Sequence, residues 1–230
     1  MSLNDEKLEH YADGCRTIEG AERYSTKYDR ELHKRISSFF ERRAIRRAIA
    51  VTGVEPGSVL DVPCGAGRLS PVLRPASSLL VSGDYSMSMV KTFRRTHDGP
   101  CFVGSAFELP FRDRAFDIVF SARLSHHISS ADRRADYLSA IMRVSRRWVI
   151  VTVFDRASLK NRVREVQRRF NHKRSKHTLS RSDVKEIAEA SGFEVATGFP
   201  LSRVMSGHVF YVLERKGATS ELALAHRAAA

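Results

Sequence analysis

Residues 59–70, VLDVPCGAGRLS, constrain the fold more than any other stretch of this chain. An apolar run reaches the carboxylate of Asp61, and the chain then passes through a turn that contains Gly65 and Gly67. Glycine lets the backbone approach a ligand without a Cβ in the way, and the helix that follows offers unpaired amide groups. The stretch therefore predicts the end of a buried strand that is either a sharp structural corner or a cradle for a ligand.

The pattern of strand, turn and helix repeats along the chain. Helices are expected over residues 30–51, 67–73, 86–96, 131–144 and 180–190, and strands over 58–62, 79–84, 101–104, 116–122, 148–154, 193–199 and 208–215. Alternating strands and helices predict an α/β, Rossmann-like fold, a mostly parallel sheet with helices on both faces. In such sheets ligands bind beyond the carboxyl ends of the strands, so the informative residues should follow each strand.

The expected organisation is a main domain with additions at both ends. The N-terminal residues 1–52 form a helical lid or cap, residues 53–216 form the main domain, and residues 217–230 form a tail. A basic insertion at 156–178 carries nine Lys or Arg between Arg156 and Lys176, against one acid. This insertion is either a clamp for an anionic substrate or a solvated helix face, and the composition leaves both readings open.

Net charge and cysteine content limit which partners and metals the chain is expected to bind. The formal net charge of +13 favours an anionic partner: nucleic acid, a phosphorylated small molecule or an anionic lipid surface. The cysteines, Cys15, Cys64 and Cys101, form no CxxC pair and have no zinc-ligand spacing, so reduced thiols and no metal are expected. No apolar stretch approaches the roughly 20 residues of a membrane helix, and the N-terminus is polar. A cytoplasmic protein without a transmembrane segment is therefore expected.

Two acids follow the first two strands. Asp61 precedes the glycines, where a carboxylate repels a pyrophosphate but suits a ligand with an ammonium or sulfonium charge. Ser70 stands where G-x-G-x-x-G needs its third glycine, which also disfavours a nicotinamide dinucleotide. Asp84 lies nineteen positions after Gly65, a spacing that favours hydrogen bonds to ribose hydroxyls. Its alternative role is that of an acid at a helix N-terminus.

Further candidates line the same predicted edge. Tyr85 and Met89 could form an apolar wall against an adenine ring, and the segment after the third strand could read the edge of adenine. His126 or His127 could accept a proton near neutral pH, or the pair could lie on the surface or cap a helix. The remaining cleft residues are expected to be Ser105, Ala106, Phe107, Ser121 and Arg123.

The blocks from Val59 to Asp155 together resemble a class I S-adenosylmethionine-dependent methyltransferase, of the broad type-11 methyltransferase domain family that includes quinone-biosynthesis C-methyltransferases. The resemblance implies a seven-stranded sheet of order 3-2-1-4-5-7-6 with the last strand antiparallel. It implies that Asp84 holds the ribose, that residues 105–107 contact adenine, and that Asp61, Gly65 and Gly67 surround the methionine part. Pro63 and Ala66 of the same loop are further cofactor-binding candidates. Pro63 and Ser105 depart from the family's commoner glycine and Asp, and VSRRW replaces a glycine-rich turn before the fifth strand.

The predicted function is methyl transfer from S-adenosylmethionine to a small-molecule or lipid-linked acceptor, at oxygen or carbon, and an anionic acceptor is one option. The candidate base is His126 or His127, with Tyr28 as a second choice, and Arg16, Tyr24 and Tyr28 are expected to close over the cofactor. A tRNA or rRNA methyltransferase is an alternative, but the chain has no Asn-Pro-Pro-aromatic block, no paired catalytic cysteines and no evident RNA-binding domain. A non-catalytic cofactor-binding module is the third possibility.

Overall fold

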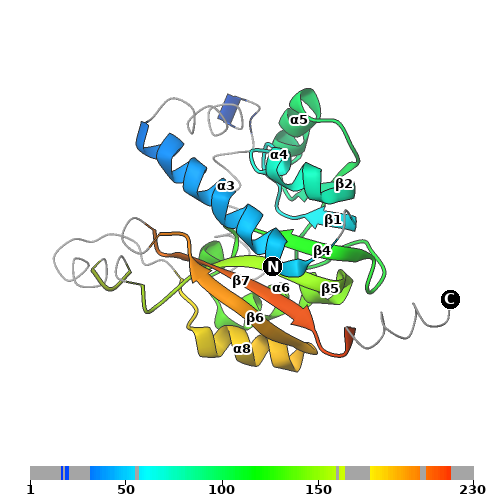
Figure 1. Ribbon diagram of the computed structural model, residues 1–230. Coiled ribbons are helices and arrows are strands. Elements are labelled where there is room, and N and C mark those ends of the chain that lie inside the picture. Colours follow the sequence, from blue (N-terminus) through cyan, green and yellow to red (C-terminus); the bar gives the residue numbers. More distant parts are fainter. Residues whose placement is uncertain are drawn as a thin grey trace.

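The computed structural model describes residues 17, 19–20, 32–54, 57–158, 161–163, 177–202 and 206–218 (Figure 1). The expected lid residues Arg16, Tyr24 and Tyr28 lie outside the described residues. So do most of the basic insertion and the tail from residue 219 onward. The strand-end residues predicted to form the site all fall within the described part.

The centre of the fold is a seven-stranded sheet of order β3-β2-β1-β4-β5-β7-β6. The strands are β1 (Gly57–Asp61), β2 (Ser77–Asp84), β3 (Cys101–Val103), β4 (Phe116–Ser121), β5 (Ser145–Phe154), β6 (Phe193–Pro200) and β7 (His208–Arg215). Strands β1 to β5 pair in parallel with their neighbours, whereas β7 lies antiparallel between β5 and β6. The predicted fold class and strand order are therefore confirmed.

The described helices are α3 (Leu32–Thr52), α4 (Ser70–Leu73), α5 (Met87–Thr96), α6 (Ala131–Val144) and α8 (Arg181–Ala190), with 3₁₀ turns η1 (Arg74–Ala76) and η2 (Ser125–His127). Serine hydroxyls cap three of them: Ser86 for α5, Ser130 for α6 and Ser180 for α8, each accepting a hydrogen bond from a first-turn amide. None of these helices is long and apolar enough to cross a bilayer, as far as the described residues go.

The expectation of a helix over residues 67–73 is wrong at its start. Gly65 and Gly67 have φ angles of +56° and +84°, which belong to the left-handed region and cannot continue a helix. The chain therefore turns through this segment, and α4 begins only at Ser70. Residues 62–69 therefore form a loop, and not a helical turn, between the carboxyl end of β1 and the start of α4.

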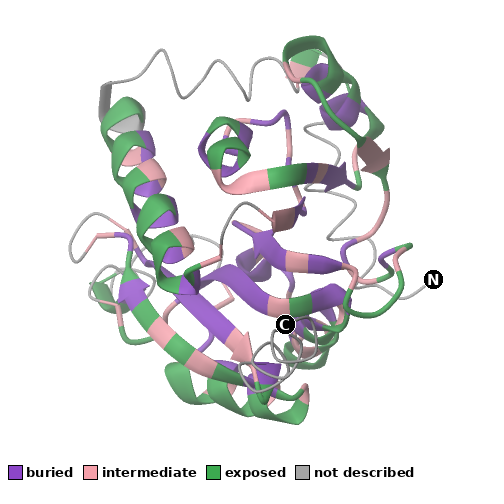
Figure 2. Cartoon of the chain, turned by 45° about the vertical axis from the view of Figure 1, so that its right-hand side comes forward, coloured by how far each residue is buried: buried purple, intermediate pink, exposed green. Residues whose placement is uncertain are grey.

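Two apolar cores lie on opposite faces of the sheet. One gathers side chains of α6 and α8, such as Tyr137, Ile141 and Val184, and the other gathers Ile45 and Ala48 of α3 with Leu73 of α4. Figure 2 shows the buried strands enclosed between helices whose outer faces are exposed. Sheets covered on both faces bury their strands almost completely, and β5 and β7 are accordingly apolar and buried over most of their lengths. The carboxyl edge of the sheet is left to carry the site.

Candidate functional site

Asp84 joins three loops at the carboxyl edge of the sheet. The carboxylate of Asp84 accepts hydrogen bonds from the amide of Gly65 (2.8 Å) and from the amide of Ser86 (2.9 Å). The backbone carbonyl oxygen of Asp84 accepts a third hydrogen bond, from the amide of Gly104 (3.0 Å), which follows β3. The loops after β1, β2 and β3 are thus tied to one residue, as expected where parallel strands end side by side.

Asp61 is a carboxyl group enclosed at the end of β1. It is 2% exposed, and its carboxylate accepts a long hydrogen bond from the Ser70 hydroxyl (3.4 Å). Burial raises the pKa of Asp61 to about 8, and the nearby negative charge of Asp84 adds to the effect. A buried carboxyl group with a raised pKa favours a neighbouring cation, because a positive charge stabilises its ionised form. The loop therefore offers a site for a positively charged group.

The pKa of Asp84 is also raised by burial, although the amides of Ser86, Gly65 and Tyr85 act in the opposite direction. Asp84 and Asp61 together place two acids at the ends of adjacent strands. Pairs of acids with raised pKa values are typical of binding sites, where the ligand completes the electrostatics.

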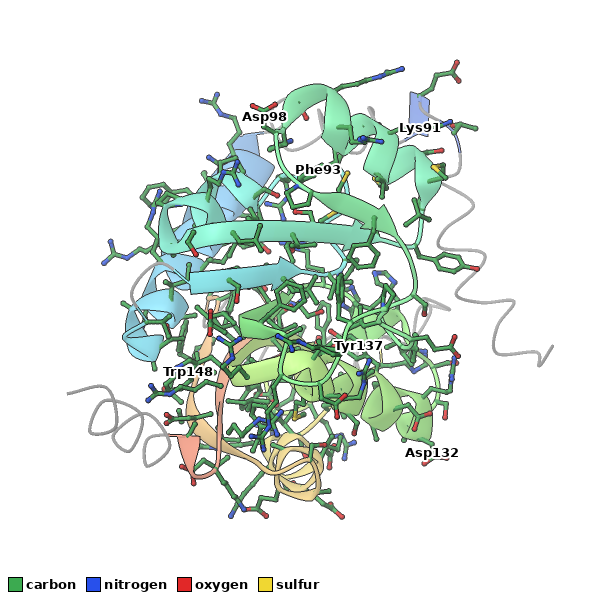
Figure 3. The ribbon with its side chains drawn as sticks, turned by 90° about the vertical axis from the view of Figure 1, so that its right-hand side faces the viewer. Lys91, Phe93, Asp98, Asp132, Tyr137 and Trp148 are labelled. Atoms are coloured by element: carbon green, nitrogen blue, oxygen red, sulfur yellow. The ribbon has the colours of Figure 1, made fainter. Side chains whose placement is uncertain are left out.

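The two glycines of the loop differ in what surrounds them. A Cβ on Gly67 would lie 2.7 Å from the rings of Phe93 and His97, so the packing of α5 against the loop requires glycine there. Figure 3 shows Phe93 on α5. A Cβ on Gly65 would meet nothing within 4 Å. The space beside Gly65 is open and borders Asp84, which makes it a cradle for a ligand that lies close to the backbone.

The remaining loop residues show how tightly the Gly65 turn is held. The amide of Cys64 donates to the carbonyl of Gly83 (2.8 Å), and the amide of Val62 donates to that of Phe120 (3.0 Å). Pro63 follows a cis peptide bond, and Ala66 is buried. Cys64 is a buried free thiol whose pKa burial raises well above its ordinary value, so it is not an activated nucleophile.

The residues predicted to lie beside the adenine differ in how far they are buried. Tyr85 is 62% exposed beside Asp84, whereas Met89 is buried within α5. The Ser105 hydroxyl accepts a hydrogen bond from the amide of Phe107 (3.2 Å), and the ring of Phe107 lies under the guanidinium of Arg133, 4.3 Å from its centroid. Ala106, which stands between Ser105 and Phe107 in the sequence, is buried.

Ser121 does not line the site, which corrects the prediction. It is fully buried, its hydroxyl donates to the carbonyl of Val62, and it is hydrogen-bonded to the Tyr137 hydroxyl. Tyr137 extends from α6 toward the sheet (Figure 3), and burial raises its pKa, so it remains a hydrogen-bond donor. β4 is apolar on both faces, so its sequence pattern could not show which way Ser121 points.

Arg123 is held in place from two sides. Its φ of +65° is unusual for a residue with a side chain, its amide donates to the Thr152 hydroxyl (2.8 Å), and its Nε lies 2.6 Å from an oxygen of Glu41. The other oxygen of Glu41 lies 2.7 Å from a guanidinium nitrogen of Arg68, just after the glycine turn. Although burial alone would raise it, the charges of Arg68 and Arg123 hold the pKa of Glu41 below its ordinary value.

The sequence reasoning missed Glu41, and a signal for it was present. It is the only acid in the sequence of α3, and it stands on the same stripe as Ala44, Ile45 and Ala48, which face the core. An acid on a buried stripe requires a charged partner. Through Glu41, helix α3 is bound to the loops after β1 and β4.

The two histidines lie on η2 beyond β4. Their ring centroids are 4.0 Å apart, and His126 is 7% exposed. The ring of His126 contacts Phe154 at the end of β5 (4.6 Å) and His208 at the start of β7 (5.1 Å). His126 is thus packed toward β5 and β7. In the described residues, no three His, Cys, Asp or Glu side chains come close enough to hold a metal ion.

Comparison with known proteins identifies the central part of the chain. Residues 60–151 match the family model described as a methyltransferase domain. The central part of the chain is thus similar to a methyltransferase domain. Demethylmenaquinone methyltransferase of Thermotoga maritima is 37% identical over 103 residues, 43% of this chain and 44% of that protein. A probable tRNA methyltransferase of Bos taurus is 32% identical over 91 residues, 39% of this chain and 19% of that protein.

The solved structures extend the methyltransferase likeness to the whole fold. Magnesium protoporphyrin IX methyltransferase from Synechocystis, crystallised with bound S-adenosylmethionine, superposes with a TM-score of 0.69 at 15% identity, over 94% of this chain and 99% of that chain. At this identity the likeness shows the fold. This chain spans less than half the length of the curated relatives just named.

Proposed function

We propose that this protein is an S-adenosylmethionine-dependent methyltransferase that acts on a small-molecule or lipid-linked acceptor. The observation that carries the proposal is the open space at Gly65, whose amide donates to the buried Asp84 and which lies in the loop after the buried Asp61. Asp84 binds Gly65 directly, and Asp61 ends the adjacent strand. A ligand with a ribose and a positively charged amino acid part matches this arrangement.

The residues of the site fit that cofactor. Asp84 has carboxylate lone pairs beyond those used by the two amides, and these can accept the ribose hydroxyls. Asp61 would face the ammonium group, whose charge would lower the raised pKa of the carboxyl. The exposed ring of Tyr85 and the backbone of residues 105–107 are the candidates for the adenine. When bound, the sulfonium supplies an activated methyl group.

The chain's own contribution to the reaction is alignment and proton removal. Holding an acceptor in line with a reactive group supplies roughly 7–11 kcal/mol of the barrier lowering in well-oriented systems. The ion pairs of Glu41 with Arg68 and Arg123 fix the loops after β1 and β4, which both lie at the carboxyl edge of the sheet. An acceptor hydroxyl or acidic carbon must also lose a proton, and we assign that task to His126 or His127.

RNA is the alternative acceptor that specific observations favour. The match to a probable tRNA methyltransferase and the formal net charge of +13 both support it. The demethylmenaquinone and protoporphyrin enzymes are, by their names, methyltransferases of small molecules, and the chain lacks the base-methylation motifs sought above. We therefore give the small-molecule acceptor priority.

Radiolabelled S-adenosylmethionine tests both steps of the proposal. The wild-type protein is expected to transfer label to the small-molecule or lipid pool of a fractionated cell extract. Asp84→Asn should weaken cofactor binding by roughly 1–3 kcal/mol, the range for unpaired buried hydrogen-bond partners, and lower the transfer accordingly. The control is Asp98→Asn, because Asp98 is an exposed acid.

Three outcomes of this experiment would contradict the proposal. Label found only in the RNA pool would establish the alternative acceptor. If calorimetry shows that the cofactor binds but no label is transferred to any pool, the protein is a non-catalytic cofactor-binding module. Equal affinity of Asp84→Asn and the wild type would refute the ribose assignment.

A further inference from the structure

A groove of about 710 Å³ lies at the same edge of the sheet as the site, but beyond β5. It runs between the start of α8, the turn after β5 and the strands β6 and β7. Its described lining includes none of the predicted cofactor residues. Its volume falls within the range of roughly 300–1,000 Å³ that small-molecule pockets occupy.

The floor of the groove is apolar. Val209 and Tyr211 of β7 contribute to it beside the exposed Gly198 and Pro200 of β6, whereas the ring of Phe199 packs into the core on the opposite face of the sheet. A Cβ on Gly198 would lie 2.8 Å from the Tyr211 ring, so a glycine is required where this ring crosses β6. The floor is thus a fixed surface against which a flat or aliphatic body can pack.

The rim of the groove is positively charged. Arg156, Arg162 and Arg181 line it and are all exposed. Arg156 lies 3.5 Å from Asp183, so part of its charge is already paired. Asp155 is the acid of the lining, and its carboxylate accepts a hydrogen bond from the amide of Ala157 (2.9 Å). Arg162 and Arg181 therefore remain as the guanidinium groups that can bind an anion through paired N–H donors.

One lining residue of the groove, Asp155, is next in sequence to a residue that packs against the histidine turn. Asp155 of the groove directly follows Phe154, whose ring contacts His126 at 4.6 Å and His208 at 4.2 Å. The amide of Asp155 donates to the carbonyl of Gly207 (2.9 Å), which holds this part of the lining in place.

We propose that this groove binds a small amphipathic anion, with its acidic group on Arg162 and Arg181 and its apolar body on Tyr211 and Val209. The groove shares no lining residue with the predicted cofactor site, so it is a separate binding site and does not rest on the proposed function. The proposal narrows its ligand to a carboxylate, sulfonate or phosphate attached to an apolar ring or chain.

Two matched fluorescent probes test the charge requirement. 8-Anilino-1-naphthalenesulfonate carries an anionic group on an apolar ring system, and N-phenyl-1-naphthylamine is the same ring system without the sulfonate. The wild type is expected to bind the sulfonate more tightly than the neutral probe. The double variant Arg162→Gln/Arg181→Gln should lose about tenfold in sulfonate affinity and leave neutral-probe affinity unchanged, because only the charge-assisted hydrogen bonds are removed. The control removes the same charge elsewhere, at the exposed residues Arg94 and Arg112, by substitution with Gln.

Two further measurements locate the probe. Ala157→Trp places an indole at the groove lining and should abolish binding of both probes, since Ala157 is exposed and its side chain carries no hydrogen bond. Saturating S-adenosylhomocysteine should leave probe binding intact, because the groove excludes the predicted cofactor residues. Equal affinity for both probes, an equal loss in the control variant, or displacement by S-adenosylhomocysteine would overturn the proposal. Calorimetry of S-adenosylmethionine on the wild type separates the two proposals: a protein that binds the sulfonate probe but not the cofactor refutes only the proposed function.

Discussion

Asp61→Asn is expected to weaken S-adenosylmethionine binding while it stabilises the unliganded protein. The substitution keeps the shape of the side chain and its contact with Ser70, but removes the negative charge that would face the ammonium group. Truncating one member of a buried charge pair costs about 2–5 kcal/mol of binding free energy. In the absence of ligand, the same carboxyl is buried with a pKa raised to about 8, so its ionisation opposes folding.

The stabilisation has a defined pH dependence. The pKa of Asp61 rises from its ordinary value of 3.8 to about 8 on folding, so the folded state retains a proton that the unfolded state has lost between these values. The contribution of Asp61 is therefore fully present below pH 4 and declines by about 1.4 kcal/mol for each pH unit up to about pH 8. The asparagine of the variant does not ionise, so the variant does not lose this stability as the pH rises. The free energy of unfolding of the variant should thus exceed that of the wild type by an amount that grows from pH 5 to pH 8 and then levels off.

Denaturant unfolding between pH 5 and pH 9 and calorimetric titration of the cofactor measure the two effects. Asp98→Asn serves as the control, since Asp98 is exposed and should change neither quantity. A stability difference that stays constant with pH would show that Asp61 titrates normally in the folded protein. Unchanged cofactor affinity would remove Asp61 from the site.

Glu41→Gln is expected to destabilise the protein by about 3–5 kcal/mol, the range for removing one partner of a buried ion pair. Glu41 is 2% exposed, and Arg68 and Arg123 are 13% and 23% exposed, so water replaces little of the lost attraction. Cofactor affinity should fall as well, because the two arginines belong to the loops after β1 and β4. The low pKa of Glu41 means that its contribution is present above pH 4.5 and is lost as the pH falls through the folded value.

The matched control for Glu41 is Glu108→Gln, at an exposed glutamate. Denaturant unfolding at neutral pH should separate the two variants clearly, and their difference should shrink in acid. If Glu41→Gln unfolds at the same denaturant concentration as the wild type, the two ion pairs do not hold α3 to the loops.

The fold, and the position of Asp61 and Asp84 at one edge of the sheet, were accessible from sequence because both depend on local patterns. Asp61 and Asp84 could be paired in advance, since the carboxyl ends of parallel strands meet at one edge whatever the helices between them do. Ser121 was misplaced because a strand buried on both faces shows no alternation. Glu41 was overlooked because its partner Arg123 lies 82 positions away, a distance at which composition gives no pairing. The groove between β6, β7 and α8 depends on the antiparallel insertion of β7, which no single segment encodes.

A crystal of this protein soaked with S-adenosylhomocysteine tests the central claim most directly. The account predicts the adenosyl group beside Gly65, with its ribose hydroxyls on the carboxylate of Asp84 and its amino acid part toward Asp61. Density for the compound in another cavity, or an empty space at Gly65 under saturating ligand, would contradict it.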